Sequence, residues 1–263
     1  MRWLKISGLL SFLIGIVVLI YMVRKADNET VLLKPEILIE VEGESAFLTK
    51  SELLIRLERG GLLPKGLSTE KLDPQKVETF IKKMSEVKAV KVYKNIGNAW
   101  KIDVVLRVPI ARIFNSYNES YYLDKEGFKI GTSNFHTARV LVFNGAIPDR
   151  MNKENVTQII NNNSLKSIRK IDDVYRISNY VCKDPILSSL IGQVFVNEQH
   201  EFVMIPIVGD QIIEFGTANT DEEVQDKFEK LKIFYEQAIP FEGWNKYSVI
   251  TIKYNGQIVC KKK

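Results

Sequence analysis

The chain has 263 residues, which is enough for one large or two modest domains, each with its own core. Hydrophobic residues make up 45% and charged residues 26%, which excludes disorder throughout, and two cysteines are too few for a disulfide scaffold or a four-cysteine zinc site. The formal charge of +5 is accounted for by Arg2, Lys5 and the three lysines at 261–263, so the remaining residues are neutral in sum and the charge gives no support for nucleic-acid binding.

Residues 6–23 (ISGLLSFLIGIVVLIYMV) form an apolar run without a charged side chain. As a helix this run would be roughly 27 Å long, close to the ~30 Å hydrocarbon core of a bilayer. It predicts one transmembrane helix, preceded by a short tail at 1–5 and followed by a juxtamembrane linker at 24–35. A cleaved signal peptide is the competing interpretation, but the run exceeds the ~7–15 apolar residues of such a peptide, and no small-x-small cleavage pattern follows it.

Three small residues fall four positions apart on one face of this segment, namely Ser7, Ser11 and Gly15. Such spacing permits close packing against a second helix in lipid, so these residues are candidates for transmembrane packing. Small residues are also common in membrane helices that have no partner.

The orientation of the segment decides the compartment of the rest of the chain. Two basic side chains precede the run and two follow it, so the positive-inside bias is nearly flat. Because the leading tail is short, we expect the amino terminus in the cytoplasm and the bulk of the chain outside it. There Cys182 and Cys260 could be bridged, or both could be free buried thiols.

Residues 36–108 predict a small α+β domain. We expect the order strand, helix, helix, strand, strand, with elements that begin near residues 37, 49, 73, 89 and 99. Thr49 and Glu52 have the spacing of a capping box, and Asp73 followed by Pro74 is typical of a helix start. Two helices packed on one face of a three-stranded sheet would bury the apolar positions of this region.

Residues 109–263 predict a mixed, mainly antiparallel β domain with flanking helices, so the whole chain is α+β. Five segments read as successive antiparallel strands, at 111–116, 120–127, 138–143, 192–208 and 211–216. Helices are expected at 171–181, shortly after Asp184 and at 221–238. A final hairpin, SVITIKYNGQIVC, turns at Asn255-Gly256.

The sequence predicts no catalytic, metal-binding or cofactor-binding residue. His136 and His200 lie in separate strand and turn contexts, and His200 has the surroundings of an exposed turn residue. Asp172 and Asp173 could be paired carboxylates, but adjacent acids at a helix start more often interact with the helix dipole. No nucleophile elbow, Walker loop or dinucleotide fingerprint is present.

The final hairpin carries apolar and aromatic residues near the end of the chain. If its last strand is a sheet edge, its unpaired backbone groups form a template to which a partner can add a strand. The alternative is that it is the last strand of a covered core. Trp244 in the preceding loop is a candidate partner contact, or it packs against its own domain.

The order of these features resembles the FtsQ/DivIB family of bacterial cell-division proteins. Residues 36–108 are similar to a POTRA domain, and the rest is similar to the FtsQ beta domain. The matching segments are ILIEVEG, the junction VPIAR, YYLDKEGFKIG, VGDQIIEFG and IKYNGQIVCKKK. The POTRA fold also occurs in outer-membrane assembly and secretion proteins, so the specificity comes from the order of the segments.

The resemblance implies a non-enzymatic divisome scaffold without a small-molecule substrate, held by a single span in the inner membrane with most of the chain in the periplasm at the division septum. It implies binding of FtsB- and FtsL-like proteins by strand addition, which links early to late division proteins and to septal peptidoglycan synthesis. The candidate partner-binding residues are Ile252, Lys253, Tyr254, Gly256, Val259 and Trp244. The alternative is a POTRA-containing envelope assembly or secretion factor that handles outer-membrane precursors.

Overall fold

A computed structural model of the chain divides into two compact units. Unit 1 comprises residues 1–40 and 48–106, and unit 2 comprises residues 41–47 and 107–263. The structure describes residues 13–23, 25, 31–42, 47–64, 66–95, 98–133, 136–152, 155–156 and 169–263.

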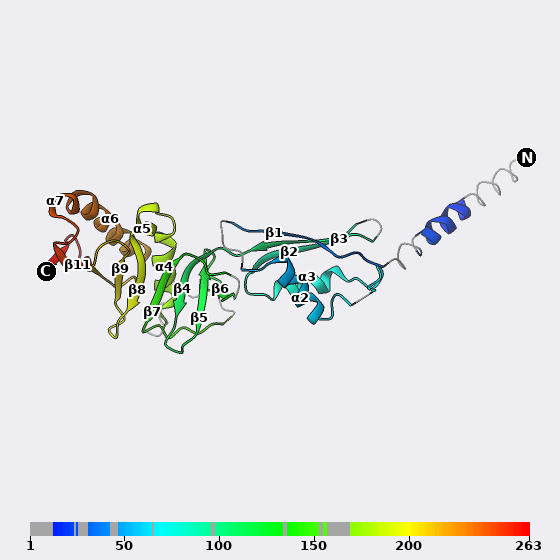
Figure 1. Ribbon diagram of the computed structural model, residues 1–263, viewed down its shortest axis with the longest axis horizontal. Helices are drawn as coiled ribbons and strands as arrows, with labels where there is room; N and C mark the ends of the chain where they lie inside the picture. The colour runs from blue at the N-terminus through cyan, green and yellow to red at the C-terminus, as the bar shows by residue number, and fades with distance from the viewer. Residues whose placement is uncertain are drawn as a thin grey trace, which may run out of the picture. The chain divides into compact units, whose positions relative to one another are not determined.

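Unit 1 contains a three-stranded sheet in the order β1-β3-β2, formed by β1 (Glu36–Glu40), β2 (Val87–Lys94) and β3 (Trp100–Leu106). β1 pairs with β3 in parallel, and β2 pairs with β3 antiparallel. Two helices, α2 (Lys50–Arg59) and α3 (Pro74–Lys82), pack against β1 and β2 respectively (Figure 1). The predicted order of strand, helix, helix, strand, strand is confirmed.

Local capping fixes where both helices of unit 1 begin. Thr49 Oγ1 accepts a hydrogen bond from the Glu52 amide at 3.2 Å, and the Asp73 carboxylate accepts from the amides of Gln75 and Lys76. These caps confirm the two predicted helix starts. Each helix then turns two aliphatic side chains into the core, Leu53 and Leu57 from α2 and Val77 and Ile81 from α3. Full burial of such a side chain contributes about 1.5–3 kcal/mol.

Unit 2 contains a nine-stranded sheet in the order β12-β11-β10-β9-β8-β7-β4-β5-β6. Figure 1 shows β9, β8, β7, β4 and β5 side by side. The strands are β4 (Pro109–Phe114), β5 (Ser120–Asp124), β6 (Lys129–Gly131), β7 (Leu141–Gly145), β8 (Ile191–Val196), β9 (Phe202–Pro206), β10 (Ile212–Gly216), β11 (Tyr247–Thr251) and β12 (Val259–Lys262).

The strands of unit 2 are not successive antiparallel neighbours as predicted. Three neighbouring pairs are parallel, namely β4 with β7, β7 with β8, and β10 with β11. Parallel neighbours require a crossover, and two of these connections contain helices. The remaining five pairs are antiparallel, so the sheet is mixed and mainly antiparallel, as expected for this region.

In the described part of unit 2, four helices accompany this sheet: α4 (Ile171–Val181), α5 (Pro185–Leu190), α6 (Asp221–Gln237) and α7 (Ile239–Glu242). The helices predicted at 171–181, after Asp184 and at 221–238 are confirmed. Side chains of α4 and α6 share one core with the strands, among them Val174, Ile177, Phe228 and Leu231. The helices therefore cover one face of the sheet, and this core holds the strands near β12 in position.

Asp172 and Asp173 do more than interact with the dipole of α4. Both side chains are buried, and Arg176 Nη1 donates to Asp173 Oδ1 at 2.8 Å while Arg176 Nη2 lies 3.5 Å from Asp172 Oδ2. Lys170 Nζ reaches Asp173 at 3.0 Å. Although these cations favour the carboxylate, burial dominates and raises the pKa of Asp173. The two acids therefore form a buried ion cluster in the core of unit 2.

Candidate partner-binding edge

β12 is the last strand of the nine-stranded sheet and lies at one end of its strand order. It pairs antiparallel with β11, with Ile250 opposite Cys260 and Thr251 opposite Val259. β11 in turn pairs in parallel with β10, which anchors the hairpin to the sheet. Because β12 has a strand on one side only among the described residues, the backbone groups of its other side can pair with an added strand.

The connection between β11 and β12 is wider than a two-residue hairpin turn. The turn lies at Asn255 and Gly256 as predicted, and Gly256 has a φ of +70°. The ladder, however, ends at Thr251 and Val259, and the amide of Ile252 donates to the carbonyl of Glu214 in β10. Residues 252–258, which we call the connecting segment, therefore leave the β11–β12 ladder.

α6 holds the connecting segment in place. Lys230 Nζ donates to the carbonyl oxygen of Tyr254 at 2.6 Å and to that of Ile252 at 3.3 Å. Burial, and to a smaller extent the positive charge of Lys227, lower the pKa of Lys230. Lys253 Nζ adds an ion pair with Glu201 at 3.3 Å. These contacts fix the backbone from which the side chain of Tyr254 projects.

The structure separates the predicted partner-binding residues into exposed and buried ones. Tyr254 and Val259 are 46% and 47% exposed, and Gly256 is also at the surface. Lys253 is half-buried. Ile252 is fully buried in the core, so its side chain cannot reach a partner. Ile252 directly follows β11 and its amide donates to the carbonyl of Glu214 in β10, so any part of this residue in partner binding stays a prediction.

Trp244 lies in the segment between α7 and β11. It is 44% exposed, and its ring lies 5.6 Å from that of Tyr235 in α6. Tyr235 is anchored by the side-chain amide of Gln211, which donates to its hydroxyl oxygen at 2.8 Å. Trp244 thus packs partly on its own unit and still presents surface.

Two neighbouring features were missed in the sequence. Phe241 in α7 is 88% exposed and adds an aromatic side chain to the surface of this region. A shallow groove of about 320 Å³ lies between α6 and the connecting segment, with Ile233, Phe234 and Ile258 in its lining. The sequence could have indicated this groove, because Ile233 is an apolar residue on the otherwise polar side of α6.

The end of β12 is basic. Lys261 and Lys262 are exposed, and Lys263 Nζ binds the Asp210 carboxylate at 2.7 Å. This hydrogen bond lowers the pKa of Asp210. The edge therefore combines open backbone, apolar side chains and positive charge, which suits recognition of a protein segment.

The remaining candidates for chemistry lie apart from this edge. In the described part of the chain, no three His, Cys, Asp or Glu side chains are grouped to hold a metal. His200 is an exposed turn residue, as expected. Cys182 and Cys260 are free; Cys182 is exposed, so it is not the buried thiol that the sequence also allowed.

The predicted transmembrane segment is only partly described. Residues 13–23 are helical, while residues 6–12, with Ser7 and Ser11, lie outside the described ranges. Gly15 lies in the helix, with nothing within 4 Å of the place where a Cβ would be. Within the described ranges, no helix is both long and apolar enough to cross a membrane.

The architecture defines a class of two-unit proteins in which a small strand-helix-helix-strand-strand domain precedes a large mixed sheet. Residues 34–105 match the family model of the POTRA-like domain, and residues 108–261 match the model described as FtsQ/DivIB, C-terminal related. The second match covers more than half of the chain, so the protein belongs to the FtsQ/DivIB-related family. No curated protein matches the chain.

This membership confirms the resemblance inferred from the sequence. It points to a role in cell division, and the family is one of non-enzymatic division scaffolds. The mixed α+β fold with a POTRA-like unit and a large sheet unit agrees with that assignment.

Proposed function

We propose that this protein is a divisome scaffold that binds FtsB- and FtsL-like membrane proteins by strand addition at β12. The observation that carries the proposal is the place of β12 at the end of the nine-stranded sheet, within the part of the chain that matches the FtsQ/DivIB-related model. An added strand would extend the sheet through backbone hydrogen bonds, which give affinity without a catalytic group. The scaffold would link early to late division proteins and to septal peptidoglycan synthesis.

Side chains around β12 would supply specificity to such an interface. Tyr254 and Val259 present apolar surface beside the added strand. Trp244, in the segment before β11, adds further exposed apolar surface. Aromatic side chains at the centre of an interface contribute most of its binding energy in many complexes. Gly256 allows the turn that brings Tyr254 there, and Lys253 is held by Glu201. We therefore assign partner binding to the exposed members of the predicted set.

We propose further that the chain is bitopic. The uncharged run at 6–23 supports a single span in the inner membrane, with the amino terminus in the cytoplasm and the residues after the span in the periplasm at the division septum. Ser7, Ser11 and Gly15 would then face a partner span. A membrane-anchored scaffold would meet FtsB- and FtsL-like proteins in the same bilayer, which raises their effective concentration.

The alternative function, in envelope assembly or secretion, draws support only from the POTRA-like match at 34–105. Depletion of the protein separates the two functions, because loss of a divisome scaffold gives filamentous cells.

A pull-down from detergent-solubilised cells tests the proposal directly. The wild-type chain should capture an FtsB-like coiled-coil membrane protein, and Tyr254→Glu should lose it because a carboxylate replaces the exposed ring. If the wild type captures no such protein, the scaffold proposal fails. If Tyr254→Glu captures it as well as the wild type, the division role survives and the proposed edge site does not.

A further inference from the structure

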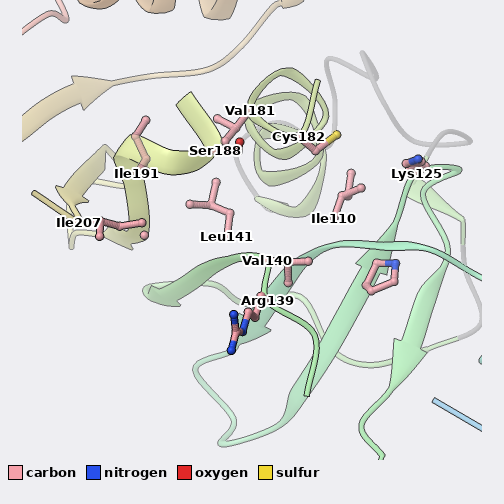
Figure 2. A pocket seen from close by; sticks show the side chains of 12 residues that line it. Ile110, Lys125, Arg139, Val140, Leu141, Val181, Cys182, Ser188, Ile191 and Ile207 are labelled. Carbon is pink, nitrogen blue, oxygen red and sulfur yellow. The ribbon is translucent and has the colours of Figure 1, made fainter. Parts of the chain in front are cut away.

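A second hollow in unit 2 lies well away from β12. It is formed where β4, β7 and β8 begin, beneath the end of α4 and beside α5, and three strands separate β8 from β12 in the sheet. Its volume is about 430 Å³, within the range of ligand-binding pockets. Figure 2 shows its lining from two sides, with Val181, Cys182 and Ser188 on one and Ile110, Val140 and Leu141 on the other.

The floor of the hollow is apolar and well packed. Leu141, Val181 and Ile191 are buried members of the core, so their positions are fixed by the sheet and by α4. Ile207 at the end of β9 is 62% exposed, although its amide is bonded to the carbonyl oxygen of Leu190. An exposed aliphatic side chain beside a fixed apolar floor leaves a surface that gains from being covered.

The charged groups that line the hollow are both positive. Arg139 precedes β7 and Lys125 follows β5, and none of the described residues of the lining carries a carboxylate. Lys125 is held by Glu42 at 2.6 Å, whereas Arg139 is exposed and has no ion pair in the described part of the chain. An anion would therefore meet Arg139 first, and the guanidinium group suits a carboxylate because it can donate two parallel hydrogen bonds.

We propose that this hollow binds a peptide segment of a partner protein in which an apolar side chain stands next to a carboxylate. The apolar side chain would cover the floor at Leu141 and Ile191, and the carboxylate would pair with Arg139. Charge complementarity selects this occupant, because an uncharged apolar segment would leave the guanidinium group unpaired and a basic segment would be repelled. The hollow is thus a second recognition site, distinct from strand addition at β12.

Cys182 provides a direct readout, because its thiol lies in the lining. In a Cys260→Ser background of the full chain in detergent, Cys182 is the single thiol, and its alkylation rate reports occupancy. The probe is the peptide Gly-Leu-Asp-Leu-Gly with blocked ends, and the matched control is the same peptide with asparagine for aspartate. We expect saturable slowing of alkylation by at least threefold, with at least tenfold weaker binding of the control peptide.

Charge reversal locates the site. Arg139→Glu should abolish the protection, while Lys183→Glu, which changes an exposed neighbour of Cys182 outside the lining, should leave the ratio of rates with and without peptide unchanged. An unaltered peptide-free rate in Arg139→Glu shows that the fold is intact. Equal protection by both peptides, no protection, or protection that survives Arg139→Glu would overturn the proposal. Protection by laurate and not by the acidic peptide would contradict a peptide occupant.

Discussion

β2 in unit 1 and β12 in unit 2 both lie at the edge of a sheet, but they differ in whether a side chain accepts a hydrogen bond from their backbone amides. Both strands carry exposed lysines, which discourage pairing with another basic strand, so the lysines do not separate them. In β2 the amide of Val92 donates to the Glu78 carboxylate of α3 at 2.8 Å. In the part of the chain that the structure describes, no side chain accepts a hydrogen bond from an amide of β12.

This difference shows that position at an edge does not by itself make a binding site. A side chain that occupies an outward amide lowers the gain from an added strand, because its hydrogen bond must first be broken. The β2 edge is closed in this way at its centre, whereas the amides of β12 that face away from β11 have no side-chain acceptor among the described residues. We therefore expect strand addition at β12 and not at β2.

The two units also differ in where they place charge, and the largest expected effect tests that difference. Arg176→Ala in unit 2 leaves Asp172 and Asp173 buried without their shared cation, and loss of one partner of a buried ion cluster costs about 3–5 kcal/mol. In unit 1, Arg56 pairs with Glu52 and Glu86 nearer the surface, so Arg56→Ala should cost about 1 kcal/mol or less. Native-state hydrogen exchange of the full chain measures both; equal losses would contradict the comparison.

The next effect concerns the two edges themselves. Tyr254 beside β12 and Tyr93 in β2 are 46% and 43% exposed, so the same substitution can be compared at matched sites. Tyr254→Glu should weaken capture of an FtsB-like partner by about thirtyfold or more, the size of an interface hot spot, while Tyr93→Glu should leave it unchanged. Quantitative pull-down measures both variants. Weakening by Tyr93→Glu alone would contradict binding at β12, because it would place the partner on unit 1.

A smaller effect tests how the connecting segment is held. Lys230→Met removes the hydrogen bonds to Tyr254 and Ile252 and should weaken capture roughly fivefold, since a single net hydrogen bond is worth about 1 kcal/mol. Lys232→Met is the control on the same helix, because Lys232 pairs with Asp184 instead, at 2.7 Å. Titration of the partner onto each immobilised variant gives the affinities. Equal weakening by both would mean that α6, rather than the connecting segment, is being perturbed.

The smallest effect lies at the end of β12. The hydrogen bond from Lys263 lowers the pKa of Asp210 below its ordinary value of 3.8. The contact therefore stabilises the folded chain above that value, and the contribution is lost as pH falls through the lowered pKa. Lys263→Ala should return the pKa of Asp210 toward 3.8, as followed by NMR titration of labelled aspartate. An unchanged pKa would show that Lys263 does not hold the end of β12.

Features with local causes could be predicted from the sequence. Thr49, Asp73 and Asp184 cap helices whose amides lie two or three residues further on, so the helix starts follow from short patterns. Unit 1 was predictable in full order for the same reason. Its strands and helices follow one another with alternating or helical periodicity, and its β2–β3 pair joins neighbouring segments.

Features with distant causes could not be predicted. α4 begins where the Asp149 carboxylate accepts hydrogen bonds from the amides of Lys170 and Ile171, a cap that comes from a loop about twenty residues earlier. The parallel pairs of unit 2 likewise join strands separated by crossovers. At the candidate site, the hairpin and its exposed tyrosine were predictable, whereas the burial of Ile252 depends on its pairing with β10.

If a partner adds a strand at β12, hydrogen exchange of the bound complex will detect the new backbone hydrogen bonds. The full chain is captured with its FtsB-like partner in detergent, and amide exchange is compared with that of the chain alone. We expect slowed exchange of amides in β12 and unchanged exchange in β2. Exchange in β12 that stays the same while the partner is bound would contradict strand addition at this edge.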